Sequence, residues 1–291
     1  MRRIIHPYLV LTLGVIAVSG AAIFIKLSSA PALAIASYRM LLASLLLLPV
    51  AWLRHRRELL TLRRRDVGLI VGSGIALAIH FAAWISSLQY TSVASSTVLV
   101  STQPIFVMLF SYLLFQEKVS RHQLIGSGLA IAGSITIGLA DTQGVATAPL
   151  RGDLLALVGA IAAAVYFLCG KAVRQHLSVI PYAATTYSVS AVALLSFAYL
   201  SGIPLWPYSR REWVLFAALA LVCTVIGHSS LNWALAYLPA AAVGIATLGE
   251  PLGASIMAFC LWREQPSLLQ LGGSVLLLSG IMLFLVPDEG M

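Results

Sequence analysis

The chain has 291 residues, of which 60% are hydrophobic and only 10% are charged, and its mean hydropathy is +0.95. Soluble domains carry about a quarter charged residues, so this composition excludes a soluble globule and predicts a membrane protein surrounded by lipid. The net charge of +8 does not indicate a nucleic-acid partner, because six of the arginines are gathered in one connection over residues 54–65.

Ten apolar stretches follow one another along the chain, each close to the roughly 20 residues that a membrane-spanning helix needs. They predict ten transmembrane helices, over residues 7–27, 31–53, 67–90, 93–115, 121–140, 151–173, 180–201, 212–237, 240–262 and 267–286. With the N-terminus in the cytoplasm, 12 Lys and Arg residues fall on the cytoplasmic side and five on the other side. The positive-inside rule therefore predicts that both termini are cytoplasmic.

The second five stretches repeat the first five at an offset of 147 residues. Gln103-Pro104 corresponds to Glu250-Pro251, and the other matched pairs are Leu88 with Leu235, Tyr90 with Tyr237, Glu117 with Glu264, Gln123 with Gln270, Gly126 with Gly273 and Gly133 with Gly280. Each half holds an odd number of spans, so the second half is expected to be inverted. We predict an all-α fold of two inverted five-helix repeats around a central cavity, over residues 1–140 and 151–291, joined by a linker over 141–150.

A ten-span chain with this repeat resembles the drug/metabolite transporter superfamily, and within it the EamA-type exporters. The motifs that carry the resemblance are Ala36-Ser37-Tyr38-Arg39 in the second span and a Glu-x₅–₈-Gly pattern that closes spans four and nine, at Glu117 and Gly126 and again at Glu264 and Gly273. The sequence is most similar to the bacterial aromatic amino-acid exporters. The resemblance implies a central cavity lined by spans one to four and six to nine, in a bacterial inner membrane.

Glu250 lies about ten residues into the ninth predicted span. A carboxylate near the bilayer midplane costs about 3 kcal/mol on insertion scales, so it is expected to face a cavity or to be paired. Pro251 weakens the helix there, and Gln103-Pro104 offers the same polar–proline pair in the first repeat. We expect Gln103 and Glu250 at the binding site, with Glu250 binding solute or coupling protons. The alternative is a protonated Glu250 hydrogen-bonded between helices.

The second span carries Tyr38 and Arg39, and the sixth carries Tyr166. An arginine at this depth must pair or reach the interface, because it cannot lose its proton. Arg39 is expected either to hold a substrate carboxylate or to pair with Glu250 or backbone carbonyls. Tyr38 and Tyr166 are expected to line the same cavity.

His80 and His228 occupy nearly equivalent places in spans three and eight, at an offset of 148. Trp84 and Asn232 follow them by four residues and therefore share their helix faces, and Trp233 is adjacent. Such faces predict a pocket that stacks an aromatic group and hydrogen-bonds its polar end, or else buried histidines bonded to neighbouring helices. No His, Cys, Asp and Glu cluster shares a face, so no metal site is expected.

These patterns predict a secondary transporter that exports small metabolites, with amino acids and especially aromatic ones favoured, and with protons as the coupling ion. No cofactor is expected, and the absence of a Walker motif argues against ATP as the energy source. The alternative is an exporter of a drug, nucleoside or sugar derivative, although phosphorylated solutes should need more deep cations than Arg39. An intramembrane enzyme is disfavoured because the chain has neither HExxH nor GxSxG.

Overall fold

The computed structural model describes residues 6–91, 96, 99–116, 119–140, 149–262 and 267–286. In these ranges all regular structure is helical, which confirms the predicted all-α membrane fold. The elements are α1 (Pro7–Leu27), α2 (Ala32–Leu60), α3 (Arg64–Ser87), α5 (Gln103–Phe115), α6 (Arg121–Ala140), α7 (Pro149–Arg174), α8 (Val179–Leu200), α9 (Arg210–Ala218), the π-helix η1 (Leu219–His228), α10 (Ser229–Ala234), α11 (Ala240–Thr247), α12 (Glu250–Trp262) and α13 (Leu268–Leu285). Seven helices of this described part are long and apolar enough to cross a membrane.

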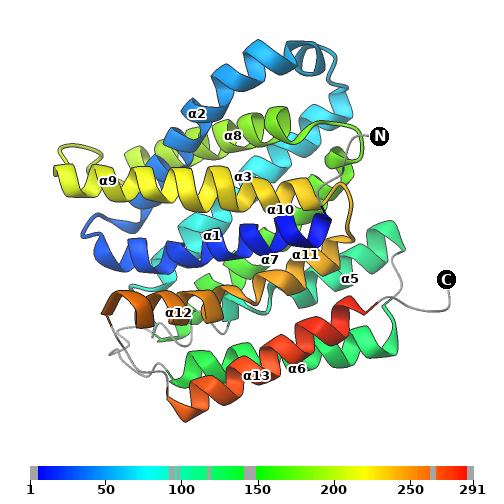
Figure 1. Ribbon diagram of the computed structural model, residues 1–291. Coiled ribbons are helices and arrows are strands. Elements are labelled where there is room, and N and C mark those ends of the chain that lie inside the picture. Colours follow the sequence, from blue (N-terminus) through cyan, green and yellow to red (C-terminus); the bar gives the residue numbers. More distant parts are fainter. Residues whose placement is uncertain are drawn as a thin grey trace.

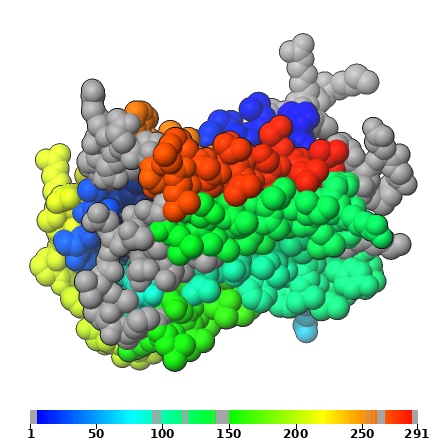
Figure 2. Space-filling model, turned by 90° about the horizontal axis from the view of Figure 1, so that it is seen from below, coloured from blue at the N-terminus to red at the C-terminus, as the bar shows by residue number. Residues whose placement is uncertain are grey.

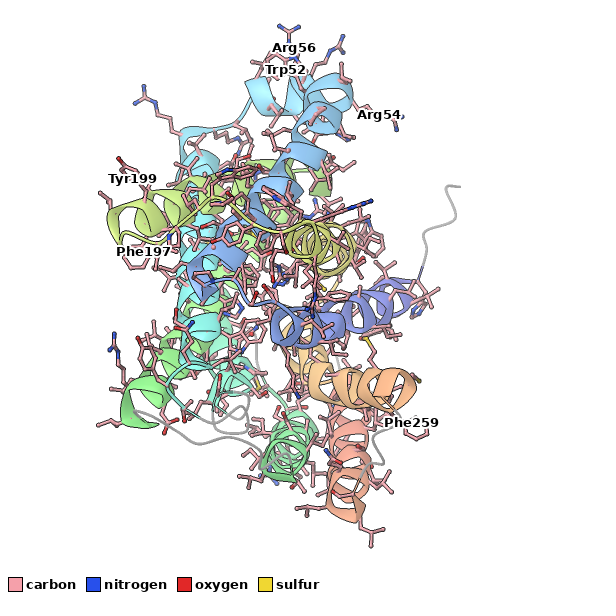
Figure 3. The ribbon with its side chains drawn as sticks, turned by 90° about the vertical axis from the view of Figure 1, so that its left-hand side faces the viewer. Trp52, Arg54, Arg56, Phe197, Tyr199 and Phe259 are labelled. Carbon is pink, nitrogen blue, oxygen red and sulfur yellow. The ribbon has the colours of Figure 1, made fainter. Side chains whose placement is uncertain are left out.

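The helices form one bundle in which α1 begins and α13 ends at the same end (Figure 1). We call this the inner end, because the basic residues predict that it faces the cytoplasm, and the opposite one the outer end. At the inner end α2 extends beyond the bundle and carries Arg54 and Arg56, the latter over the ring of Trp52 at 4.9 Å (Figure 3). Phe197 and Tyr199 point outward and are 54% and 77% exposed, as expected of side chains that face lipid.

The helices α6 and α13 begin at the same local motif. Ser120 and Gln123 exchange side-chain to backbone hydrogen bonds of 2.9 and 3.3 Å, and Ser267 and Gln270 form the corresponding capping box. This motif satisfies backbone N–H groups that a helix start leaves free. It explains why Gln123 and Gln270 match in the repeat. Glu117 and Glu264, which the sequence places just before, lie outside the described residues, as do 141–148 of the predicted linker.

Helices α6 and α13 pack against each other through repeat-related glycines and lie side by side on one face of the molecule (Figure 2). A Cβ added at Gly126 would lie 2.7 Å from the carbonyl oxygen of Gly280, and one at Gly133 would lie 2.6 Å from that of Gly273. Gly126 therefore contacts Gly280, the repeat mate of Gly133, and Gly133 contacts Gly273, the repeat mate of Gly126. Such reciprocal contacts are what a two-fold relation between the two halves requires.

The other major helix pairings are also related by the two-fold relation between the repeats. Helix α2 packs on α8, α3 packs on α7, and α1 packs on η1 and α10. If each helix is replaced by its repeat mate, the pairing of α2 with α8 is unchanged. The pairing of α3 with α7 becomes the pairing of α1 with η1 and α10. The chain is thus a two-repeat membrane protein in which every span of one repeat has a partner in the other.

The eighth span contains the ten-residue π-helix η1 in place of a continuous α-helix. Upstream of it, Asp66 corresponds to Glu212 at an offset of 146 residues, whereas downstream Tyr90 corresponds to Tyr237 at 147. The second repeat therefore contains one extra residue in this interval. A π-helix closes its hydrogen bonds over five residues instead of four, so it can absorb an insertion, and such segments recur at functional sites.

Candidate functional site

Spans four and nine are broken in the middle, where the sequence led us to expect continuous helices. Ser101 and Thr102 form a turn before α5, and Leu248 and Gly249 form a turn before α12. The new helices begin at Gln103 and at Glu250, the two repeat-related residues that precede a proline. Proline fits the first turn of a helix because its missing N–H has no partner there. Both breaks therefore place the positive end of a helix inside the membrane, as in many transporter sites.

Gln103 is 8% exposed, and its side-chain nitrogen Nε2 has no hydrogen-bond partner among the residues that the structure describes. Glu250, its repeat mate, is half-buried. A buried amide that lacks a partner loses its bond to water without replacement, which is unfavourable. These two positions are therefore suited to receive a polar group from a bound molecule.

Arg39 is the central charge of the site, and it is 1% exposed. Its Nε donates to the hydroxyl of Thr224 at 2.8 Å, and its guanidinium carbon lies 4.2 Å from the ring centroid of Phe81. Glu250 lies within range of a Coulombic interaction with it. The terminal nitrogen Nη1 has no hydrogen-bond partner in the described part of the chain. The guanidinium is thus held in place while one of its ends is left without an acceptor.

The hydroxyl of Thr224 is oriented by the π-helix. It donates to the carbonyl oxygen of Leu219, five residues earlier, at 3.0 Å, so its oxygen is free to accept the hydrogen bond from Arg39. Sequence analysis did not single out Thr224. The one-residue change in repeat offset around this segment is the signal that could have drawn attention to it.

His80 and Trp84 on α3 stack with 5.9 Å between ring centroids and an interplanar angle of 13°. The Nδ1 of His80 donates to the carbonyl oxygen of Gly159 at 2.9 Å when it carries the proton. His228 lies edge-on to Phe81, with ring centroids 5.5 Å apart, and its Nδ1 has no hydrogen-bond partner among the described residues. Both histidines thus lie in the same aromatic cluster as the Arg39 guanidinium.

Tyr166, Tyr187 and Asn232 form a buried hydrogen-bond network beside this cluster. The amide nitrogen of Asn232 donates to the hydroxyls of Tyr166 at 2.6 Å and of Tyr187 at 3.3 Å. The ring of Tyr166 lies 6.1 Å from that of His228. The side-chain oxygen of Asn232 has no partner in the part that the structure describes. Tyr187 was absent from the predicted site, because a hydroxyl within a span is more often explained by helix packing.

Tyr38 and Trp233 lie apart from this group. The ring of Tyr38 packs on Trp213 and Phe216 toward the outer end, with centroids 4.8 and 5.0 Å away, and its hydroxyl donates to the carbonyl of Leu205. Trp233 lies 4.4 Å from Tyr237, centroid to centroid. It lines an open cavity of about 490 Å³ at the inner end, together with His55, Arg174, Gln175, His176, Leu177, Ser178, Val179, Ile180, Ala236 and Tyr237.

Comparison with known families matches the chain over residues 6–139 and again over 150–286 to the EamA-like transporter family. An uncharacterized transporter of Archaeoglobus fulgidus is 26% identical over 284 residues, covering 95% of this chain and 96% of that relative. The inner membrane protein YtfF of Escherichia coli is 27% identical, with 87% of this chain and 86% of YtfF covered.

A third relative, named pseudopaline exporter CntI, from Pseudomonas aeruginosa, is 26% identical over 85% of this chain and 84% of its own length. Among solved structures, one crystal structure superposes with a TM-score of 0.82 at 16% sequence identity and covers 95% of both chains. That likeness concerns the fold alone.

Proposed function

Because the chain belongs to the EamA-like transporter family, we propose that it is a secondary transporter that exports small metabolites by alternating access. The favoured solutes are amino acids, and aromatic ones above all. The protein is a multi-pass membrane protein, and we place it in a bacterial inner membrane, where its relative YtfF is named as residing.

The observation that carries the proposal is the free end of the Arg39 guanidinium. A buried cation is stable in a membrane only when it is paired, yet its only hydrogen bond among the described residues goes to a neutral hydroxyl. A solute carboxylate would supply the missing acceptor at Nη1, and guanidinium–carboxylate pairs are among the stronger hydrogen-bonded pairs. Glu250 would then lie near the amino group of the same solute, so a zwitterion would match both charges.

The aromatic preference rests on the rings around the guanidinium. Phe81, His80, Trp84, Tyr166 and His228 offer stacking or edge-on surfaces close to the charged group. Aromatic pairs in such arrangements are worth about 0.5–1.5 kcal/mol beyond their buried area. A phenylalanine or tryptophan side chain would therefore gain more from this pocket than a small polar one.

Proton coupling is the remaining part of the proposal, and Glu250 would carry it. It lies within range of a Coulombic interaction with the central arginine, and it begins the helix α12 inside the membrane. Intramembrane carboxylates are frequent members of proton relays. Uptake or release of a proton at Glu250 would be linked to solute binding, because both change its charge interaction with Arg39.

A second solute class is favoured by one comparison. CntI is named as an exporter of pseudopaline, so a chain related to this one over most of its length is not named as an amino-acid exporter. An exporter of a larger metabolite, drug, nucleoside or sugar derivative is therefore the alternative proposal. All of these share the requirement for an anionic or polar group that can reach Arg39.

Counterflow in proteoliposomes that contain only this protein tests the solute class. Vesicles loaded with unlabelled phenylalanine should accumulate labelled phenylalanine, because exchange requires only a facilitated pathway. Loading with phenylalanine methyl ester, which lacks the carboxylate, or with phenylpyruvate, which lacks the amine, should reduce the uptake strongly. Equal uptake with the ester would contradict the role of Arg39, and no counterflow with any amino acid would favour the alternative solutes.

A further inference from the structure

Two acidic side chains occupy corresponding places at opposite ends of the bundle. Asp66 lies in the first turn of α3 at the inner end, and Glu212 lies in the first turn of α9 at the outer end (Figure 1). The sequences around them, Arg64-Arg65-Asp66 and Arg210-Arg211-Glu212, match. Both acids are only 5% exposed although each lies at a helix end. Such burial requires a partner for each carboxylate.

Glu212 binds the turn between α1 and α2. Its carboxylate oxygens accept hydrogen bonds from the hydroxyl of Ser28, and from the backbone N–H and the hydroxyl of Ser29, the last two at 2.9 Å each. The neighbouring Arg211 donates to the carbonyl oxygen of Leu27 at 3.1 Å. Hydrogen bonds to a charged group are about twice as strong as neutral ones. The outer end of α9 is therefore firmly attached to this turn.

Asp66 binds the repeat-related loop between α7 and α8. Its carboxylate oxygen lies 3.0 Å from Nε2 of His176, and His176 corresponds to Ser29 at the repeat offset of 147. The side chain of His176 is 49% exposed and lines the open cavity at the inner end. The two contacts are thus equivalent under exchange of the repeats. The outer one has three hydrogen bonds, whereas Asp66 has a single contact with the inner loop, which is also held by a 2.9 Å hydrogen bond from the N–H of Ser178 to Glu58 of α2.

Each contact attaches one site-bearing helix to the turn before another. The helix run α9, η1 and α10 carries Thr224, His228 and Asn232, and the turn that Glu212 holds leads into α2, which carries Arg39. In the same way α3 carries His80 and Trp84, and the loop that Asp66 holds leads into α8, which carries Tyr187. Opening either contact would therefore let the helices around the site separate at that end.

We propose that Glu212 with Ser28 and Ser29 forms an outer latch, that Asp66 with His176 forms an inner latch, and that the two close in alternation. The proposal rests on the alternating access of the proposed function. In this structure both latches are formed, the outer one by three hydrogen bonds and the inner one by a single contact beside the open cavity. Because one rocking equilibrium would connect the two ends, weakening one latch shifts the population toward the state that closes the other.

Hydrogen–deuterium exchange of the full chain in lipid nanodiscs tests this coupling at the end far from each substitution. Glu212→Gln should slow exchange in the inner segment 174–180, and Asp66→Asn should slow exchange in the outer segment 201–211. Removing charged hydrogen bonds is expected to change the equilibrium by up to about tenfold, so a several-fold change in far-end exchange is expected. The double substitution Ser28→Ala with Ser29→Ala should act like Glu212→Gln, since it removes two side-chain donors from the other side of the latch.

Asp153→Asn is the matched control. Asp153 accepts a 2.8 Å hydrogen bond from the hydroxyl of Thr91, also at the outer end, but it joins α3 to α7, which pack along their lengths. It should leave both far-end segments unchanged. Faster exchange at both ends in the latch variants, or no change at the far end, would overturn the proposal. The exchange measurement needs no solute, so its outcome is independent of whether amino acids are transported.

Discussion

Arg39 shows how one side chain can define a site. Its guanidinium is fixed by Thr224 and by the ring of Phe81, so it loses little further freedom when it binds a solute. The unpaired Nη1 leaves the buried charge incompletely compensated until an anion arrives. Glu250 lies within range of a Coulombic interaction with the guanidinium. Binding of a solute carboxylate at Nη1 of Arg39 is therefore the chemical event around which transport would be organised.

Glu250→Gln tests the part that the Glu250 carboxylate plays in this event. If Glu250 takes up the coupling proton, flux through the wild-type protein should change with pH, whereas flux through Glu250→Gln should be nearly independent of pH. Glutamine keeps the size of the side chain but cannot titrate. Proteoliposome uptake measured between pH 6 and 8, a range chosen for vesicle stability, checks this. A variant with unchanged flux and an unchanged pH profile would remove Glu250 from the mechanism.

Trp84→Ala tests the aromatic surface. Loss of the ring that stacks on His80 should weaken phenylalanine binding more than threonine binding, by about three- to tenfold, because only the aromatic solute uses the π-surface. Competition of each amino acid against labelled uptake gives the two affinities. Trp213→Ala, in the outer aromatic group around Tyr38, is the control and should affect both solutes alike. Equal losses in Trp84→Ala would assign this ring to the scaffold.

The sequence could single out Arg39, His80, Trp84, Glu250 and Asn232 as candidates, because polar or charged groups inside a span need a partner. It could not separate them from their neighbours Tyr38 and Trp233. Adjacent residues on a helix point about 100° apart, so Arg39 faces the centre while Tyr38 faces the outer aromatic group. Only the packing of the helices decides which of two adjacent residues faces inward.

At the scale of elements, hydropathy predicts the spans but does not reveal where they break. A window of about 20 residues averages hydropathy across Gln103 and across Glu250, so the predicted spans run through both breaks. The polar–proline pairs marked the two places, and the structure shows that each starts a new helix. The π-helix η1 has no such composition signal, and only the shift in repeat offset indicates it.

The contact between α6 and α13 gives a sharp prediction of stability. Gly133→Ala would place a Cβ 2.3 Å from the backbone nitrogen of Leu277, so the two helices must move apart. Overpacking of this kind costs about 1–3 kcal/mol, which should outweigh the gain of about 1 kcal/mol in helix propensity. Thermal unfolding in detergent should show a lower midpoint.

Gly128→Ala is the matched control on the same helix, since nothing lies within 4 Å of its added Cβ. It gains the same helix propensity without the clash, so its unfolding midpoint should stay the same or rise. Two adjacent glycines on α13 provide an independent check. Gly273→Ala meets the backbone of Gly133 and Ile137 at 3.0 Å, whereas Gly272→Ala meets nothing. Equal midpoints within either pair would contradict the close approach of α6 and α13.

At the scale of the whole molecule, the internal repeat accounts for the arrangement of the bundle. Each major helix pairing either joins repeat mates or has a repeat-related counterpart. This relation could be predicted from the matched residues and the odd number of spans in each half. The sequence could not predict which helices pack against each other, because many apolar faces of similar composition can pack in a membrane. Small residues such as Gly126 and Gly133 select the close partner through shape.

The repeat leaves one property of the molecule undecided, which is the side of the membrane that each end faces. An inverted pair of repeats has nearly the same fold in either orientation, so the distribution of basic residues must determine which end faces the cytoplasm. The segment 54–65, from the last turns of α2 to the start of α3, carries six arginines at the inner end, and moving them across the bilayer would be costly. We therefore expect the inner end to face the cytoplasm, with both termini there.

Single cysteines introduced into a chain whose native cysteines are replaced by alanine check this orientation. Ser201 lies in the exposed connection at the outer end, and Gln175 is exposed at the inner end. A membrane-impermeant maleimide added to intact cells should label Ser201→Cys and leave Gln175→Cys unlabelled until the cells are opened. The reverse pattern would contradict the predicted orientation, and it would exchange the sides of the two proposed latches. The open cavity beside His176 would then face the outside of the cell.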